Sequence, residues 1–167
     1  MGFFIEFIGE IMIVAGTGHR PKYCPCLYDP NHEWLLKLKN NIKKELIDNK
    51  VTCVISGMAL GWDTWLAQVA LEMNIPVWAY IPFKGQEKKW PEISKKEYER
   101  IVKNAKYVKY FADAYIGKDL FLRRDKGMVD DADMIFSLLN PEVNSGGTFY
   151  TVGYAKEKDK KIINFWF

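Results

Sequence analysis

The feature that most constrains the fold is an alternation of short apolar segments with longer amphipathic segments along the chain. The short segments are rich in β-branched residues, which is typical of buried strands. Parallel strands joined by crossover helices produce this pattern. We therefore predict an α/β protein, a Rossmann-like three-layer sandwich with a mainly parallel sheet flanked by helices. The predicted strands are 11–15, 51–56, 76–81, 106–110, 133–138 and 161–166.

The amphipathic segments predict the helices between these strands. Asp29 and Pro30 supply an N-cap and a first-turn proline, so we expect the first helix to begin there. Residues 82–97 are polar and contain two prolines, which predicts a loop over one end of the sheet, either a lid or a plain connection. The predicted helices are about 30–49, 62–74, 94–104, 118–131 and 147–159.

A chain of 167 residues has the length of one ordinary domain, and we expect a single domain over residues 1–167. Residues 1–11 are either an N-terminal extension or an added edge strand. Glu6 and Glu10 interrupt their apolar run, so we expect neither a signal peptide nor a membrane span. The net charge of +3 is too small to predict a nucleic-acid-binding surface.

The cysteine and histidine content argues against a disulfide framework and against a metal site. Three cysteines are an odd and sparse set that fits a reducing compartment, so we expect a cytoplasmic protein. Cys24 and Cys26 are close in sequence, but no second Cys or His pair follows at zinc-finger spacing. The two histidines, His19 and His32, form no cluster. We therefore expect no metal and no cofactor.

Three glycine-bearing turns follow predicted strands, which is where the ligands of open parallel sheets bind. In the first turn, glycine allows the backbone to approach a ligand closely, and Arg20 can hold a phosphate or a carboxylate. The alternative is a tight turn whose arginine forms a structural salt bridge. The candidate ligand-binding residues of this turn are Gly16, Thr17, Gly18, His19 and Arg20.

The second turn, SGMALGWD at 56–63, brings small residues to a predicted helix start, where backbone N–H groups favour anions. Asp63 has two equally weighted interpretations. It caps the helix, or it faces the pocket and bonds a ribose hydroxyl. The candidate residues of this turn are Ser56, Gly57, Met58, Ala59, Gly61 and Asp63.

The third turn precedes the last predicted helix. Two glycines and a threonine at a helix N-terminus form a nest of N–H donors that suits a phosphate, and a glycine-rich loop without a ligand is the alternative. None of the three turns is a Walker A loop or a G-x-G-x-x-G fingerprint. The candidate phosphate-binding residues are Asn140, Ser145, Gly146, Gly147 and Thr148.

Four segments occur in an order that resembles the SLOG superfamily, specifically its YpsA-like branch: GTGHRP, SGMALGWD, RRDKGMVDDAD and SGGTFYTVGYAKEKDKKI. The resemblance covers about 12–167. It implies a pocket for nucleotides or their derivatives at the strand ends, with the phosphate on the SGGT segment, and self-association into a homo-oligomer. It also assigns Arg124, Asp130 and Asp133 to the site, with Arg123 as the alternative to Arg124.

The turns and the resemblance together predict a protein that binds a nucleotide-derived small molecule as a sensor, carrier or sequestering protein. The first alternative is a hydrolase of an N-glycosidic bond, with Asp63 and Asp130 as carboxylates that stabilise an oxocarbenium-like transition state. The related LOG phosphoribohydrolases carry a catalytic glutamate where this chain has Thr151, which argues against that activity. The second alternative is a single-stranded nucleic-acid-binding module, which the scattered lysines do not favour.

Overall fold

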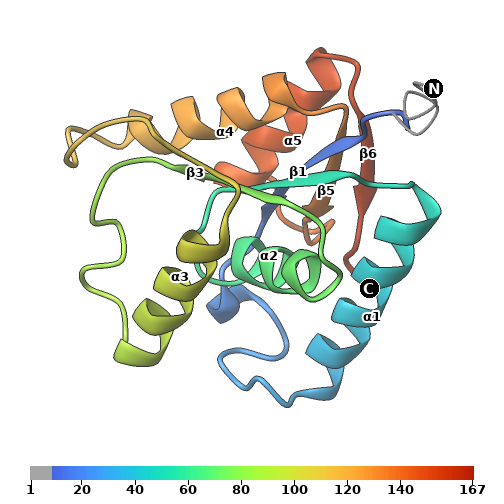
Figure 1. Ribbon diagram of the computed structural model, residues 1–167, viewed down its shortest axis with the longest axis horizontal. Coiled ribbons are helices and arrows are strands. Elements are labelled where there is room, and N and C mark those ends of the chain that lie inside the picture. The colour runs from blue at the N-terminus through green and yellow to red at the C-terminus, as the bar shows by residue number, and fades with distance from the viewer. Residues whose placement is uncertain (1–8) are drawn as a thin grey trace, which may run out of the picture.

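A six-stranded sheet with helices on both faces forms the fold in the computed structural model, which describes residues 9–167 (Figure 1). The strand order is β4-β3-β2-β1-β5-β6, and every neighbouring pair is parallel. The predicted α/β fold is confirmed, and the sheet is wholly parallel. The strands are β1 (Ile13–Gly18), β2 (Cys53–Ser56), β3 (Val77–Ile81), β4 (Tyr107–Tyr110), β5 (Met134–Leu138) and β6 (Lys161–Asn164).

The helices form the two outer layers. One face of the sheet is covered by α1, α2 and α3, and the other by α4 and α5 (Figure 1). No helix within residues 9–167 is both long enough and apolar enough to cross a bilayer. The helices are α1 (Glu33–Asp48), α2 (Trp62–Glu72), α3 (Glu92–Asn104), α4 (Asp119–Asp131) and α5 (Gly147–Glu157), with a short 3-10 helix η2 (Pro21–Tyr23).

The predicted start of the first helix is wrong. α1 begins at Glu33, because Nδ1 of His32 accepts a hydrogen bond from the backbone N–H of Trp34 at 3.1 Å and caps the helix. Asp29, the predicted cap, instead accepts a hydrogen bond from the Asn31 N–H at 2.9 Å and stabilises a turn before the helix.

Two other boundaries also differ from the prediction. α3 begins at Glu92, two residues before its predicted start, so the polar loop predicted over 82–97 ends at residue 91. Residues 9–11 form no strand, and the rest of the predicted N-terminal extension lies outside the described residues. The first strand therefore begins at Ile13, close to its predicted start.

Side chains that alternate along the central strands divide the core into two halves. Val14 belongs to the cluster shared with α1, α2 and α3, in which Leu38 and Leu66 are fully buried. Its neighbour Ala15 belongs to the cluster on the opposite face, with Met128 of α4. Because both faces are apolar, each central strand is a nearly continuous hydrophobic run.

The chain reverses its direction of travel across the sheet between β1 and β5. From β1 the chain adds β2, β3 and β4 on one side, and it then returns to place β5 and β6 on the other. The segment after β1 leads to α1 on one face, and the segment after β5 leads to α5 on the opposite face (Figure 1). Open α/β sheets bind ligands beyond the carboxyl ends of the strands at such a switch point.

Candidate functional site

The glycines of the first motif make room for α2 and are not placed for contact with a ligand. β1 extends to Gly18, so Gly16 and Gly18 lie within the strand. A Cβ atom on Gly16 would stand 2.6 Å from Leu66 Cδ2, and one on Gly18 would stand 2.6 Å from Trp62 Cβ and Cδ1. Thr17 between them is buried. Among the residues predicted for this motif, only His19 and Arg20 lie beyond the end of the strand.

His19 joins the ends of three segments. Its carbonyl accepts a hydrogen bond from the Trp62 N–H at 3.2 Å, and its Nε2 accepts one from the Asn140 N–H at 3.0 Å. Its own N–H donates to the Leu138 carbonyl. Burial lowers the pKa of the imidazole and so favours the neutral ring, which the acceptor role of Nε2 requires. His19 therefore positions the loop after β5.

The second motif forms a buried turn that is held by its own polar atoms. The Ser56 hydroxyl accepts from the Met58 N–H at 3.1 Å and donates to the Asp63 carbonyl at 2.9 Å. Met58 has a φ of +58°, a left-handed conformation that costs energy for a residue with a side chain. Oδ2 of Asp63 accepts from the Ala59 N–H at 3.2 Å. Asp63 therefore does not cap α2, as one interpretation predicted: it is the second residue of the helix, the N-cap is Gly61, and its carboxylate holds the turn that precedes the helix.

Gly61 and Gly57 belong to the same turn, and neighbouring atoms leave no space for a side chain at either position. Gly61 caps α2 with a φ of +86°, and a Cβ there would stand 2.6 Å from the His19 carbonyl oxygen. A Cβ on Gly57 would stand 2.7 Å from Arg124 Nη1 and 2.8 Å from Asp63 Oδ2. The second motif therefore shapes the scaffold beneath the strand ends and brings an arginine and an aspartate together against Gly57.

Behind the turn lies a polar cluster that combines the buried Asp63, Arg124 and Thr151 with the partly buried Asp125. The guanidinium of Arg124 donates to the Gly57 carbonyl at 2.5 Å and to Asp125 Oδ1 at 2.7 Å, and the Thr151 hydroxyl donates to Asp125 Oδ2 at 3.2 Å. Burial raises the pKa of Asp63 to about 6, although the nearby Arg124 charge opposes the rise. Sequence reasoning missed Asp125, whose only signal was its place beside an arginine.

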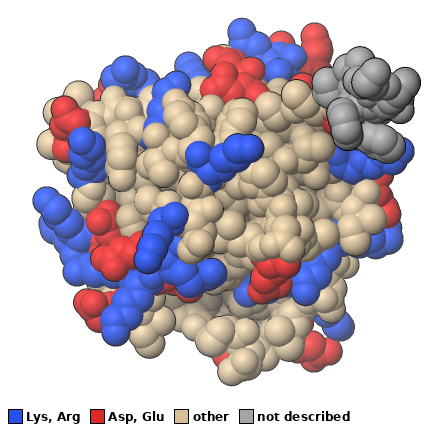
Figure 2. Space-filling model, in the orientation of Figure 1, with Lys and Arg blue, Asp and Glu red and all other residues tan. Residues whose placement is uncertain are grey.

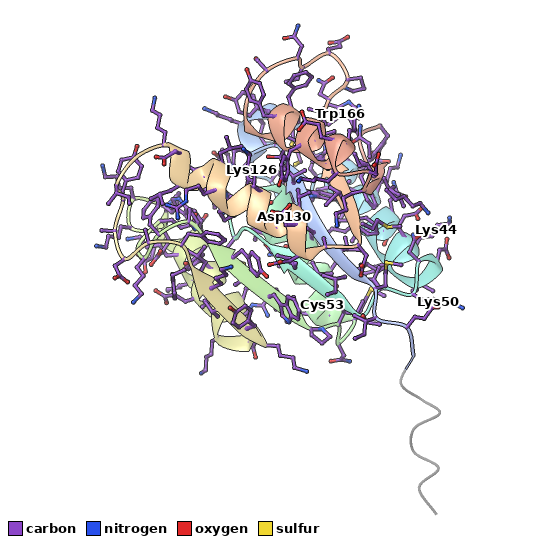
Figure 3. The ribbon with its side chains drawn as sticks, turned by 90° about the horizontal axis from the view of Figure 1, so that it is seen from above. Lys44, Lys50, Cys53, Lys126, Asp130 and Trp166 are labelled. Atoms are coloured by element: carbon purple, nitrogen blue, oxygen red, sulfur yellow. The ribbon has the colours of Figure 1, made fainter. Side chains whose placement is uncertain are left out.

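Arg124 is the inward arginine of its motif, and Arg123 is exposed. The two aspartates assigned with it are not brought to the site. Oδ2 of Asp133 accepts from the Ile13 N–H at 2.9 Å, at the amino edge of the sheet. Asp130 accepts from the Tyr154 hydroxyl at 2.7 Å, and Figure 3 shows it near the end of α4 on the side of Cys53, away from Trp166. Both lie there because α4 ends just before β5 begins.

An open cavity of about 330 Å³ lies at the switch point, between the turn after β1 and the loop after β5. We call it the β1–β5 pocket. It joins Arg20 of the first motif to the glycine-rich loop of the third, as the prediction of a strand-end site requires. Asn140 does not line it, because its backbone N–H is held by His19 and its Oδ1 accepts from the Glu142 N–H. The lining residues are His19, Arg20, Tyr23, Val143, Ser145, Gly146, Gly147 and Thr148.

The pocket has the electrostatics of an anion site. Its floor is the N-terminus of α5, where the first backbone N–H groups have no intrahelical partner and the N-cap Gly146 offers no capping side chain. A Cβ on Gly146 or Gly147 would meet nothing within 4 Å, so the approach to these N–H groups is open. Arg20 adds a positive charge, and none of the lining residues is acidic.

An aromatic ring and a cation stand beside the anion site. Tyr23 is 60% exposed, and the Lys22 ammonium lies 4.9 Å from its ring centroid. The ring therefore offers a face on which a planar group can stack. Within residues 9–167, no three His, Cys, Asp or Glu side chains gather in a metal-binding arrangement. The pocket therefore offers a ligand backbone N–H donors, one guanidinium group and one aromatic face.

Comparison with known proteins assigns the chain to a family. The profile of the YspA SLOG family matches residues 14–166. The chain belongs to this family. The chain is 26% identical over 155 residues to the UPF0398 protein YpsA of Bacillus subtilis (strain 168), and the match covers 87% of this chain and 85% of the relative. It is 26% identical over 156 residues to a UPF0398 protein of Bacillus cereus (strain ATCC 14579), with 87% and 83% covered.

Solved structures share the fold of this chain. DNA processing protein A of Streptococcus pneumoniae superposes with a TM-score of 0.67 at 18% identity, over 92% of this chain and 50% of that protein. This chain thus spans half the length of that neighbour. The molybdenum cofactor carrier protein of Chlamydomonas reinhardtii superposes with a TM-score of 0.56 at 13% identity, over 93% and 76% of the two chains. These similarities support the Rossmann-like architecture.

Proposed function

We propose that this protein binds a nucleotide or a nucleotide derivative in the β1–β5 pocket, as a sensor, carrier or sequestering protein. One observation carries the proposal: the uncapped N-terminus of α5 and the guanidinium of Arg20 face a single cavity that no acidic residue lines. Helix N-termini and arginine forks are the groups that proteins use to hold phosphates. A phosphate on Gly147 and Thr148 places the rest of the ligand toward Tyr23, whose exposed ring suits a nucleobase.

Nucleoside phosphates, ADP-ribose-like molecules and cyclic nucleotides all contain the two groups that this pocket suits. The family membership supports a ligand-binding role in general terms. One structural neighbour is a carrier protein of the molybdenum cofactor, but its 13% identity to this chain supports the fold alone.

The hydrolase alternative has less support from the geometry. Hydrolysis of an N-glycosidic bond needs a carboxylate beside the sugar. Asp63 is buried against its own turn and Arg124, and Asp130 lies near the C-terminal end of α4, bonded to Tyr154. The position of the LOG glutamate is taken by Thr151, which is buried and bonded to Asp125. Binding without turnover therefore accounts for the pocket better than catalysis does.

Nucleic-acid binding is the remaining alternative. One structural neighbour, DNA processing protein A of Helicobacter pylori, binds single-stranded DNA, but its 18% identity to this chain supports the fold alone. On the face shown in Figure 2, basic and acidic side chains are intermixed, including over α3. Electrostatic binding to a phosphate backbone favours a concentrated basic surface. A single-stranded oligonucleotide consequently belongs in the ligand panel as a competing outcome.

The test compares Arg20→Gln with Arg123→Gln, which removes an exposed arginine outside the pocket. Melting temperature and calorimetric titration are measured with inorganic phosphate, AMP, ADP-ribose, cyclic AMP and a single-stranded oligonucleotide, and size-exclusion chromatography reports self-association. We expect AMP or ADP-ribose to bind without turnover. Arg20→Gln should weaken binding about ten- to hundred-fold, because a charge-assisted hydrogen bond is lost, and Arg123→Gln should not. Equal binding by both variants, or binding of the oligonucleotide alone, would contradict the proposal.

A further inference from the structure

One ring nitrogen of His19 is left without a partner beside the β1–β5 pocket. Nε2 accepts from the Asn140 N–H, so the proton of the neutral ring lies on Nδ1. The Nδ1–H has no acceptor among residues 9–167, and it is not enclosed, because the buried side-chain atoms without a partner there are Gln68 Oε1 and Glu87 Oε2. His19 is 8% exposed and lines the pocket. Its side chain therefore presents a donor to the cavity.

Two aromatic neighbours and one hydrogen bond hold the ring of His19 in place. Its centroid lies 6.1 Å from that of Tyr23 in η2 and 5.9 Å from that of Trp166, which meets the ring edge-on. Trp166 packs in turn on Trp34 of α1, with 5.7 Å between the centroids. Together with the bond from Asn140, these contacts fix the direction of the Nδ1–H. A donor that is already held in place loses little conformational freedom when a ligand binds.

We infer that His19 donates its Nδ1–H to an oxygen of a terminal phosphate on the ligand, and that the pocket therefore prefers a phosphomonoester to a phosphodiester. This inference rests on the proposed function and adds a donor and a ligand class to it. The Nδ1–H and the Arg20 guanidinium follow β1, and the free N–H groups of α5 lie on the other side of the cavity. All of these groups donate and none accepts.

A terminal phosphate matches this arrangement better than a diester does. A phosphomonoester offers three strong acceptor oxygens and carries nearly two negative charges at neutral pH. A phosphodiester has one such oxygen fewer and a single charge. Donors on both sides of the cavity, with no acidic residue in its lining, favour the group that has more acceptor oxygens and more charge.

Two substitutions at His19 separate the roles of its ring nitrogens. His19→Gln places an amide oxygen near the position of Nε2, so it keeps the acceptor for Asn140 and loses the donor at Nδ1. His19→Asn places an amide N–H near the position of Nδ1, so it keeps the donor and loses that acceptor. We expect His19→Gln to bind AMP about ten-fold more weakly than the parent and more weakly than His19→Asn. A purely structural role would give the opposite order, because His19→Asn is the variant that releases the loop after β5.

AMP and cyclic AMP form the matched pair of ligands, since they share a base and a sugar and differ in the phosphate ester. In calorimetric titrations the parent should bind AMP at least about ten-fold more tightly than cyclic AMP, and His19→Gln should lose most of this preference. Melting temperatures show which variants fold. Arg20→Gln should weaken the binding of both ligands, because the guanidinium is attracted to either phosphate.

The tautomer of His19 is measured directly in protein that carries ¹⁵N-labelled histidine. The chain has two histidines, and the second is an internal control of opposite tautomer, because Nδ1 of His32 accepts from the Trp34 N–H. Long-range ¹H–¹⁵N correlation spectra at about pH 7.5, above the ordinary pKa of histidine, distinguish the two rings. We expect His19 to be protonated on Nδ1, and we expect AMP to shift this nitrogen while the His32 signals stay unchanged.

Three results would overturn the inference: a His19 protonated on Nε2, equal AMP binding by the parent and His19→Gln, or equal binding of AMP and cyclic AMP by the parent. If Arg20→Gln weakens AMP binding and His19→Gln does not, this inference fails and the proposed function stands. If the parent binds no nucleotide of the panel, both fail.

Discussion

Replacing Gly18 with alanine tests whether the glycines of the first motif serve packing or ligand contact. The added Cβ would stand 2.6 Å from Cβ and Cδ1 of Trp62, a side chain with no exposed surface. Such overpacking costs about 1–3 kcal/mol. Any movement of the indole also strains the hydrogen bond from its Nε1 to the Phe136 carbonyl, 3.1 Å long, which is worth about 1 kcal/mol. We expect Gly18→Ala to lower the free energy of unfolding by about 2–4 kcal/mol.

The matched control is Gly147→Ala. Gly147 has no positive φ, and an added Cβ there would meet nothing within 4 Å. The free energy of unfolding should therefore stay the same or rise by up to about 1 kcal/mol, because alanine restricts the unfolded chain more than glycine does. If a phosphate approaches the α5 N-terminus closely, the same substitution should weaken the binding of AMP.

Urea unfolding followed by tryptophan fluorescence and circular dichroism measures both variants. A double-mutant cycle with Trp62→Leu separates the contact from general strain, because the smaller side chain leaves room for the Cβ. Gly18→Ala should then cost at least about 1 kcal/mol less in the Trp62→Leu background than in the parent. A loss below about 1 kcal/mol in the parent, or equal losses in both backgrounds, would refute the packing argument.

Three other predictions concern the charged interior. Burial raises the pKa of Asp63 from 3.8 to about 6, so between these pH values the folded protein keeps a proton that the unfolded chain has lost. Relative to Asp63→Asn, the parent should lose about 3 kcal/mol of unfolding free energy as the pH rises from about 4 to 6.5, and a flat difference across urea titrations would contradict this. The pKa of His19 is lowered below 6.5, so relative to His19→Gln the parent should lose stability as the pH falls below 6.5. Arg124→Met should lower the unfolding free energy by about 3–5 kcal/mol, because the buried Asp63 and the partly buried Asp125 lose their cation, whereas Arg123→Met should change it by less than about 0.5 kcal/mol in thermal unfolding.

The sheet was predictable because each central strand is apolar on both faces. VTCVIS and DMIFSL are nearly continuous hydrophobic runs bounded by helical patterns, which is sufficient to predict parallel strands. The start of α1 was not predictable in the same way. Its first turn is fixed by Trp34, whose ring stacks on Phe167 at 5.4 Å, at the other end of the chain. Without that contact, the local sequence does not show whether Asp29 or His32 is the N-cap of α1.

The candidate site was predictable in its location but less so in its members. Arg20 and the segment 145–148 do line one cavity, since parallel topology brings these strand ends together. Whether Gly18 serves a ligand or a neighbouring helix depends on where α2 docks, which sequence alone does not specify. The misplacement of Asp130 and Asp133 was avoidable, because residues that directly precede a strand lie at the amino edge of a parallel sheet.

The buried parts of the motifs determine the shape of the open pocket although they do not line it. His19 holds the loop after β5 through the Asn140 N–H. Thr151 holds the first turn of α5 from the inside, because its hydroxyl contacts both the Gly147 carbonyl at 2.8 Å and Asp125 Oδ2 at 3.2 Å. Neither contact uses the free N–H groups at the start of α5, so these remain directed at the cavity. Thr151, at the position where the resemblance to LOG enzymes implies a glutamate, thus holds in place the helix start that lines the proposed anion site.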